Sequence, residues 1–194
     1  MSGQAFALFD TPIGRCGIAW GDQGLIGMQL PEATPVAAWA RLRQRFPAAA
    51  ELPPPPEIER VIDRIVALLA GGRDDLADVL LDPTGVPAFN LRVYEIARAV
   101  VPGMTSTYGE VARAMDEPGA ARAVGKALGE NPWPIVVPCH RVLAASGRMG
   151  GFTADGGPTT KARLLTLEKA KTSAVPTLFD LEFSVAPPRA WPAG

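Results

Sequence analysis

The sequence predicts a mixed α+β fold in two parts, a small sheet-plus-helix part followed by a mainly helical part. Short β-prone runs separated by glycine and proline turns fill the first thirty residues, and from about residue 87 one helical pattern follows another. A length of 194 residues allows one domain or two small ones, and 47% hydrophobic against 20% charged residues is typical of a globular protein.

The first part begins with a hairpin or meander. Its turns are Pro-Ile-Gly and Asp-Gln-Gly, and the expected strands lie near residues 5–9, 15–20 and 24–30. A helix over 35–46 follows, and its apolar face carries Val36, Trp39, Leu42 and Phe46. Four consecutive prolines at 53–56 predict an extended spacer, because proline locks φ and lacks an amide donor. A second helix then ends at Gly71-Gly72, and one more strand is expected at 79–82.

A domain boundary is expected near residues 83–88, which separates an N-terminal domain, 1–86, from a C-terminal domain, 87–170. Helical patterns in the second part cover AFNLRVYEIARAV, YGEVARAM and GAARAVGKALGEN. Residues 171–194 contain four prolines and no amphipathic period, so an irregular tail is expected there.

Composition excludes several classes of protein. No stretch approaches the 18–20 apolar residues of a membrane span, and the N-terminus lacks a signal-peptide pattern, so we expect a cytoplasmic protein. Two cysteines and one histidine cannot form a four-ligand zinc site or a disulfide framework, so no metal or cofactor is expected. The net charge of −1 argues against a broadly basic surface, although residues 91–170 alone carry +3.

Two short helices joined by the turn Asp116–Gly119 have the outline of a helix-turn-helix. The second helix is rich in alanine and glycine, and Arg122 is its isolated large residue. Such a helix can approach another surface closely, and the arginine can enter a nucleic-acid groove or replace a displaced base. An ordinary helical corner packed in a core would have the same pattern.

The segment NPWPIVVPCHRVL holds the candidate nucleophile. Cys139 is followed by His140, the one histidine of the chain. A thiol must lose its proton to act as a nucleophile, and His140 can accept that proton through a bridging water if a carboxylate orients it. A buried structural cysteine beside an incidental histidine is the alternative.

The string Pro-Cys-His-Arg-Val, together with Asn131-Pro132, Tyr108-Gly-Glu and Ala-Arg122-Ala-Val-Gly, resembles the 6-O-alkylguanine-DNA alkyltransferases. These are direct-reversal DNA repair proteins, and the resemblance covers roughly residues 88–169. It implies a ribonuclease-H-like N-terminal domain, and a protein that binds double-stranded DNA as a monomer through the minor groove. It also implies a single-use methyltransferase that moves an alkyl group, chiefly methyl, from 6-O-alkylguanine, and less well from 4-O-alkylthymine, to its own cysteine.

The resemblance also implies a role for each site residue. Cys139 accepts the alkyl group, His140 draws the thiol proton, Glu168 orients His140, Tyr108 donates to the extruded base, and Asn131 holds the turn before the cysteine. Arg122 fills the vacated place in the base stack. The remaining DNA-binding or base-binding residues are Ala121, Ala123, Gly125, Leu128, Val142, Phe152 and Thr153. Arg141 and Pro138 are structural, with Arg141 paired within the core.

One departure from the family pattern concerns the loop GFTADGGPTTK, where many members have a Tyr-Ser-Gly-Gly type of sequence. Phe152 lacks the tyrosine hydroxyl, Thr153 replaces a common serine, and Ala154-Asp155 resembles an insertion. The sequence therefore leaves the range of accepted alkyl groups open. Two other functions remain as alternatives, a sensor that binds alkylated bases without transfer and a thiol hydrolase that uses Cys139 and His140.

Overall fold

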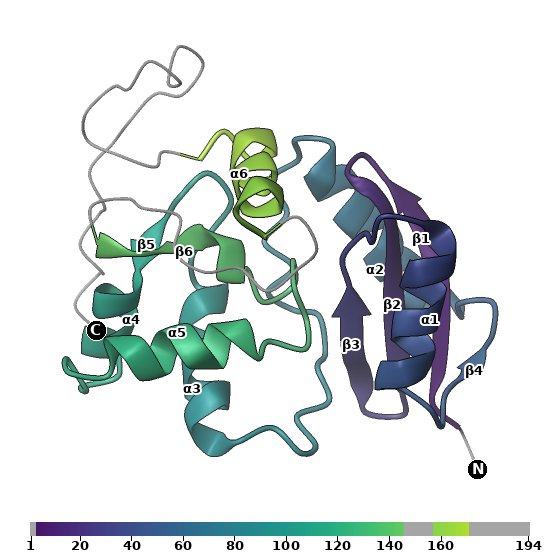
Figure 1. Cartoon of the computed structure of the whole chain (residues 1–194), viewed down its shortest axis with the longest axis horizontal. Coiled ribbons are helices and arrows are strands. Elements are labelled where there is room, and N and C mark those ends of the chain that lie inside the picture. The colour runs from purple at the N-terminus through teal and green to yellow at the C-terminus, as the bar shows by residue number, and fades with distance from the viewer. Residues whose placement is uncertain (1–2, 146–156, 171–194) are drawn as a thin grey trace.

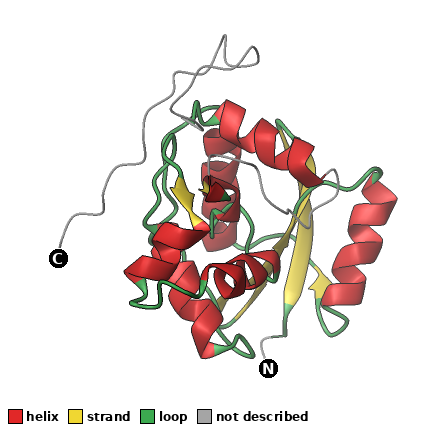
Figure 2. Ribbon diagram, turned by 60° about the vertical axis from the view of Figure 1, so that its left-hand side comes forward, coloured by secondary structure: helices red, strands yellow, loops and turns green. Residues whose placement is uncertain are grey.

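The structure is a computed structural model that describes residues 3–145 and 157–170. Its first part is a four-stranded sheet in the order β3-β2-β1-β4, with α1 on one face and α2 on the other (Figure 1). The second part is mainly helical and lies beside the β3 edge of this sheet, as the two ribbon views agree (Figure 2). The predicted α+β fold is confirmed. The tail at 171–194 lies outside the described residues.

The three predicted strands are confirmed as β1 (Ala5–Thr11), β2 (Gly14–Gly21) and β3 (Gly24–Gln29). They form an antiparallel meander, in which Ala5 faces Trp20 and Gly17 faces Gln29. Alternate residues of a strand point to opposite faces of a sheet. Phe6 accordingly joins the cluster under α1, and Ala5 joins the large core cluster on the other face. The short strand β4 (Ala50–Glu51), which pairs parallel to β1, was not predicted.

Helix α1 (Pro35–Arg45) forms where it was predicted, but only Leu42 and Phe46 of its predicted apolar face pack against the sheet. Val36 is 76% exposed and Trp39 is 41% exposed, whereas Leu42 is fully buried. The physical reason lies in the sheet, because Gly17 has no side chain and Leu42 occupies the space above it. A Cβ on Gly17 would lie 2.3 Å from Leu42 Cδ1. The space over Gly17 in β2 therefore determines which side chain of α1 packs against the sheet.

Helix α2 (Pro56–Leu69) starts directly after the extended Pro55, so the predicted spacer ends one residue early and Pro56 is already the first residue of the helix. The strand predicted at 79–82 is wrong, because this segment makes only one bridge with the end of β3. Two backbone hydrogen bonds join the segment to β3, from Leu25 N to Leu80 O and from Asp82 N to Leu25 O. Further along the same edge, Met28 N donates to Pro132 O at 2.8 Å. The β3 edge is thus shared between two segments, and neither extends into a full strand.

The predicted helices of the second part are confirmed as α3 (Ala88–Arg98), α4 (Tyr108–Ala114) and α5 (Ala121–Gly129). A fourth helix, α6, covers Gly157–Leu167. Two very short parallel strands, β5 (Ser106–Thr107) and β6 (Val142–Leu143), were not predicted. Their pairing places the start of α4 beside the segment that follows the Cys139–Arg141 turn. The turn between α4 and α5 begins at Asp116, which has a φ of 60° and ends α4.

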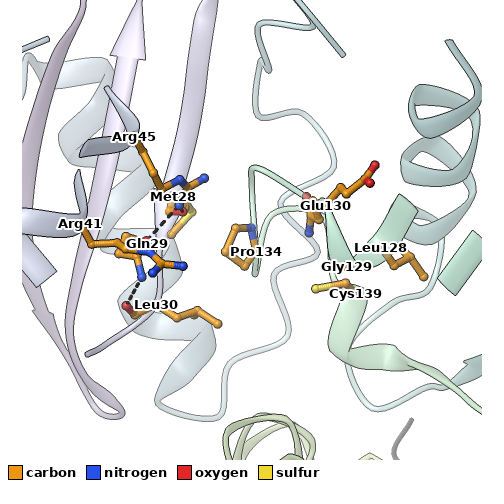
Figure 3. A pocket seen from close by; sticks show the side chains of 11 residues that line it. Met28, Gln29, Leu30, Arg41, Arg45, Leu128, Gly129, Glu130, Pro134 and Cys139 are labelled. Carbon is orange, nitrogen blue, oxygen red and sulfur yellow. Dashed lines mark hydrogen bonds between the residues drawn. The ribbon is translucent and has the colours of Figure 1, made fainter. Parts of the chain in front are cut away.

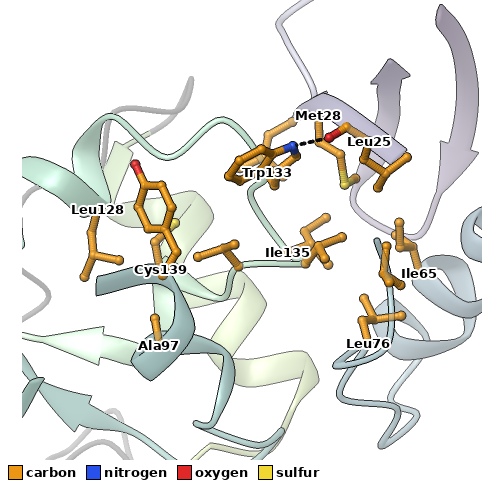
Figure 4. Close-up of a cluster of buried hydrophobic side chains, with 14 of the residues drawn as sticks. Leu25, Met28, Ile65, Leu76, Ala97, Leu128, Trp133, Ile135 and Cys139 are labelled. Atoms are coloured by element: carbon orange, nitrogen blue, oxygen red, sulfur yellow. Dashed lines mark hydrogen bonds between the residues drawn. The ribbon is translucent and has the colours of Figure 1, made fainter. Parts of the chain in front are cut away.

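Trp133 connects the two parts of the molecule. It is 1% exposed, and its indole Nε1 donates to Leu25 O at 2.7 Å (Figure 4). On the helical side its ring meets Tyr94 edge-on, with centroids 6.0 Å apart. One hydrophobic cluster contains residues from the sheet and from the helices. The division at residues 86 and 87 stays a prediction, and the packing here is continuous across it.

Within residues 3–145 and 157–170, no helix is long and apolar enough to cross a membrane.

We expect Trp133→Phe to lower the free energy of unfolding by about 1–3 kcal/mol, because it removes a buried hydrogen bond and leaves a cavity between the two parts. The matched control is Trp39→Phe, whose indole is partly exposed and bonds Glu51 at the surface. It should change stability by less than about 0.5 kcal/mol. Urea unfolding measures both variants, and equal midpoints would show that Trp133 does not join the two parts.

Candidate active site

The chain before Cys139 is a tight loop that Asn131 closes. The Asn131 side chain accepts a hydrogen bond from Trp133 N at 2.9 Å and donates to Val137 O at 2.9 Å. Inside this loop Ile135 has a φ of 78°, a left-handed conformation that costs a β-branched residue about 1–3 kcal/mol. Its side chain is buried in the core, which holds this conformation in place (Figure 4). Asn131 therefore closes the turn before the cysteine, and its part in the reaction stays a prediction.

Cys139 opens a single 3₁₀ turn, Cys139–Arg141, at the end of this loop. Pro138 lies before the turn, and its carbonyl accepts the Arg141 amide at 2.9 Å. The thiol is 7% exposed. Burial raises the pKa of Cys139, while the Asn131 side chain, the charge of Lys161 and nearby backbone amides act in the opposite direction. The cysteine is consequently a neutral thiol at neutral pH and needs a base to react.

His140 and Glu168 form a buried pair, whose role in orienting the imidazole stays a prediction. His140 Nε2 lies 3.0 Å from Glu168 Oε1, and both side chains are almost fully buried. Burial raises the pKa of Glu168, but hydrogen bonds and charge from His140 and Arg141 outweigh it and hold this pKa at about 2. An ionised carboxylate can only accept, so Nε2 of His140 carries the hydrogen. Nδ1 of a neutral ring is then the free acceptor, and it has no partner among the described residues.

Arg141 is the second partner of Glu168. It donates from Nε to Oε2 at 2.8 Å and from Nη2 to Oε1 at 2.7 Å, while Nη1 donates to Val100 O at 2.7 Å. This two-bonded pair fixes the plane of the carboxylate. Arg141 is thus paired within the core, and its structural role stays a prediction. Burial is the main cause that lowers the pKa of His140, which keeps the imidazole neutral beside the carboxylate.

Lys161 on α6 is a site residue that the sequence analysis missed. It is fully buried, its Nζ donates to Val142 O at 2.7 Å, and the same atom lies 5.7 Å from the centroid of the Tyr108 ring. Burial lowers its pKa to about 8, and the charge of Cys139 acts in the opposite direction. A lysine at helical spacing is ordinarily taken as a solvent-exposed residue. The sequence around Lys161 does not show that β6 and Tyr108 bury this side chain.

Tyr108 begins α4, where Thr107 and Glu110 form a capping box. The ring is half-buried, and burial raises the pKa of its hydroxyl. Helix α5 passes this ring at Gly125, since a Cβ there would lie 4.0 Å from Tyr108 Cε1. Tyr108, Lys161 and Cys139 therefore belong to one group of interacting side chains.

Helix α5 presents its small residues and Arg122 away from the core. Arg122 and Ala123 are exposed, and Ala121 and Gly125 are partly exposed. Arg122 has no hydrogen-bond or ion-pair partner within residues 3–145 and 157–170, so its side chain is available to a ligand. Leu128, by contrast, is buried and faces the site. Val142 is fully buried in β6. Phe152 and Thr153 lie outside the described residues.

A cavity of about 270 Å³ separates Cys139 from the first part of the molecule (Figure 3). Its helical side includes Leu128, Asn131, Pro134 and Cys139, and its sheet side includes the end of β3 and two arginines of α1. The sulfur of Cys139 points into the gap. In the described ranges no group of three or more metal-ligating side chains lies together.

The fold and the site define a protein with a buried thiol, a neutral imidazole oriented by a carboxylate, and a helix-turn-helix directly before them. Residues 88–170 match the family model described as the 6-O-methylguanine DNA methyltransferase, DNA binding domain. The methylated-DNA–protein-cysteine methyltransferase of Mycobacterium tuberculosis (strain ATCC 25618 / H37Rv) is 37% identical over 90% of this chain and 98% of its own length. The chain belongs to this family of methyltransferases.

Two further relatives agree with this assignment. The bifunctional transcriptional activator/DNA repair enzyme Ada of Escherichia coli (strain K12) is 33% identical over 84% of this chain and 45% of its own length. The crystal structure of Mycobacterium tuberculosis OGT in complex with DNA has a TM-score of 0.71 and 34% identity, and it covers 88% of this chain and 96% of that one. The family, fold class and enzyme class predicted from the sequence are confirmed, whereas the individual site roles stay predictions.

The pKa of Glu168 makes a pH-dependent contribution to stability. An unfolded glutamate has a pKa of about 4.3, so a folded value of about 2 means that the folded protein favours the ionised form. This stabilisation, on the order of 3 kcal/mol, is present above about pH 4.3 and is lost as the pH falls toward 2. We expect Glu168→Gln to lack that part of the acid transition and to be less stable at pH 7 by about 3–5 kcal/mol, because Arg141 keeps a buried charge without its partner.

Urea unfolding between pH 7 and pH 2.5 measures this contribution. The control is Glu95→Gln, an exposed position on α3, which should keep the acid transition of the unchanged protein. Identical pH profiles for the unchanged protein and Glu168→Gln would contradict the assignment of the low pKa to Glu168.

Proposed function

We propose that the protein repairs double-stranded DNA by moving an alkyl group, chiefly methyl, from the 6-oxygen of guanine to Cys139. 4-O-alkylthymine is a poorer substrate. The protein acts in the cytoplasm as a monomer and needs no cofactor. The observation that carries the proposal is the joining of Cys139, His140 and Glu168 in one buried site directly behind α5, in a chain of the methyltransferase family.

Helix α5 enters the minor groove in this proposal, with Ala121, Ala123 and Gly125 against the DNA. The 6-oxygen of a paired guanine lies inside the base stack on the major-groove edge. The alkylated nucleotide must therefore rotate out of the helix, at a cost of a few kcal/mol. Arg122, exposed and without a protein partner among the described residues, fills the vacated place and offsets part of that cost.

The extruded base lies against Leu128 and Val142, with Tyr108 able to donate a hydrogen bond to it. Phe152 and Thr153 complete the base pocket in this proposal. The thiol proton of Cys139 moves through a water molecule to Nδ1 of His140, and Glu168 stabilises the imidazolium that forms. The Cys139 sulfur then forms a bond to the alkyl carbon, and the carbon–oxygen bond of the base breaks.

The electron pair of the broken bond stays with the base. A hydrogen bond from Tyr108 stabilises the developing negative charge on the guanine leaving group. The repaired guanine takes up one proton, which balances the proton that His140 received from the thiol. Lys161 lies at the ring of Tyr108, and its positive charge also favours the thiolate. The product on Cys139 is a thioether, and these residues provide no route to hydrolyse it. Each protein molecule therefore reacts once.

The first test of this function is adduct formation. Incubation with double-stranded DNA that contains 6-O-methylguanine should place one methyl group on each protein molecule, located on Cys139 by peptide mass spectrometry. Cys139→Ser should form no adduct. Cys16→Ser is the matched control, because Cys16 is buried in β2 and should leave the reaction unchanged.

Other outcomes of this experiment would replace the proposal. Tight binding of the damaged DNA without an adduct would identify a sensor of alkylated bases. Many turnovers on an activated ester, with no methylated cysteine, would identify a thiol hydrolase.

The role of Arg122 predicts a kinetic effect that differs from its effect on binding. Arg122→Ala should slow methyl transfer from duplex DNA by about tenfold or more, because a lost stabilisation of about 1.4 kcal/mol already corresponds to tenfold. Affinity for undamaged duplex DNA should fall by less than about threefold, since one of several cations is lost. Rapid-quench and filter-binding measurements give the two quantities.

Arg113→Ala on α4 is the control, because it removes the same charge from an exposed position of the neighbouring helix. A single-stranded substrate, in which no base pair must be broken, should largely restore the rate of Arg122→Ala. Equal rates for the Arg122→Ala and unchanged proteins on duplex DNA would refute the assigned role.

A further inference from the structure

The cavity beside Cys139 is larger than a methyl group requires. Its volume is about 270 Å³, and it extends from Cys139 and Pro134 across to residues of β3 and α1. Figure 3 shows the Cys139 sulfur directed toward that far wall, where Arg41 and Arg45 lie. A substituent on the 6-oxygen that is longer than methyl would extend from the reacting carbon into this space.

The far wall carries positive charge without an equal negative charge. Arg45 donates to three neutral acceptors, Met28 O at 2.6 Å, the Gln29 side-chain oxygen at 3.0 Å and Pro132 O at 3.4 Å. No carboxylate of the described residues pairs with it. Among the described residues, Arg41 has one distant ion-pair partner, Glu32 at 4.0 Å, and that carboxylate also accepts from Gln29 at 2.7 Å.

The two guanidinium groups also repel each other. Burial lowers the pKa of Arg45, and the charge of Arg41 lowers it further. Glu130 belongs to the opposite wall, but its carboxylate accepts from Asn90 at 3.0 Å and lies 3.7 Å from Lys126. Figure 3 shows this carboxylate pointing away from the arginines. An anion placed in the cavity would therefore relieve the repulsion between Arg41 and Arg45.

We propose that this cavity receives the alkyl group beyond its reacting carbon, and that Arg41 and Arg45 favour groups that end in a carboxylate. This inference rests on the proposed function. The reaction is the same displacement at Cys139, with a sulfur–carbon bond formed and the carbon–oxygen bond of guanine broken. The carboxylate keeps its charge throughout and stays beside the arginines in the thioether product.

Matched pairs of duplex substrates test this preference. One pair carries 6-O-carboxymethylguanine or its neutral amide, 6-O-carbamoylmethylguanine, and the other carries the 4-carboxybenzyl or 4-carbamoylbenzyl group. Acid and amide have nearly the same size, so the ratio of their transfer rates reports charge. We expect the unchanged protein to react about three to ten times faster with the acid of at least one pair, as for a partly exposed ion pair.

Arg41→Gln should reduce the ratio of the acid and amide transfer rates toward one, because it removes a positive charge from the cavity wall. The fold should be kept, since Arg41 makes no hydrogen bond within the described residues. Arg43→Gln is the control, because Arg43 lies on the same helix but donates to Ala49 O and stacks on Trp39, away from the cavity. It should keep the ratio of the unchanged protein. Arg45 is left in place, because its bond to Pro132 O holds the two parts together.

A 6-O-methylguanine duplex separates the two proposals. If the unchanged protein does not react with it, the proposed function fails. If it reacts but takes acid and amide at equal rates in both pairs, only the carboxylate preference is overturned. If Arg41→Gln slows methyl, acid and amide equally, Arg41 binds DNA phosphate instead, and the inference is also overturned.

Discussion

The buried carboxylate of Glu168 is the group on which the rest of the site depends. It accepts two hydrogen bonds from Arg141 and one from His140, so the end of α6 is joined to the 3₁₀ turn that begins with Cys139. Removing an ion from water costs several kcal/mol unless its partners are well placed, and here three donors surround one carboxylate. The same arrangement determines which nitrogen of His140 carries hydrogen. Structural stability and the base that the reaction needs therefore come from one interaction.

Burial keeps this site unreactive until a substrate is bound. Burial raises the pKa of Cys139 and lowers that of His140, so both groups are neutral at rest. A buried neutral thiol resists oxidation and reacts with few electrophiles. That property suits a protein that can use its cysteine only once. In the proposed reaction, the alkyl carbon of an extruded base, with a leaving group stabilised by Tyr108, supplies the activation that the thiol itself lacks.

The first part of the molecule contributes to the site although the family model covers only residues 88–170. The β3 edge binds Pro132 through Met28, and Trp133 inserts beside Leu25, immediately before the strained turn at Ile135. The sheet thus supports the loop that presents Cys139. It also forms one wall of the cavity, which is why residues of α1 can influence which alkyl groups are accepted.

The sequence by itself determined the order of β1 to β3 and of helices α1 to α5, the helix-turn-helix outline and the Cys139-His140 pair, because these features depend on periodicity and on neighbours a few residues apart. Glu168 was found by resemblance, since 28 residues separate it from His140. Only the tertiary structure decided that Lys161 is buried, that Leu42 rather than Val36 enters the sheet, and that Arg41 faces the cavity. Burial and pKa depend on segments that are distant in the chain and meet only on folding, so no local pattern contains them.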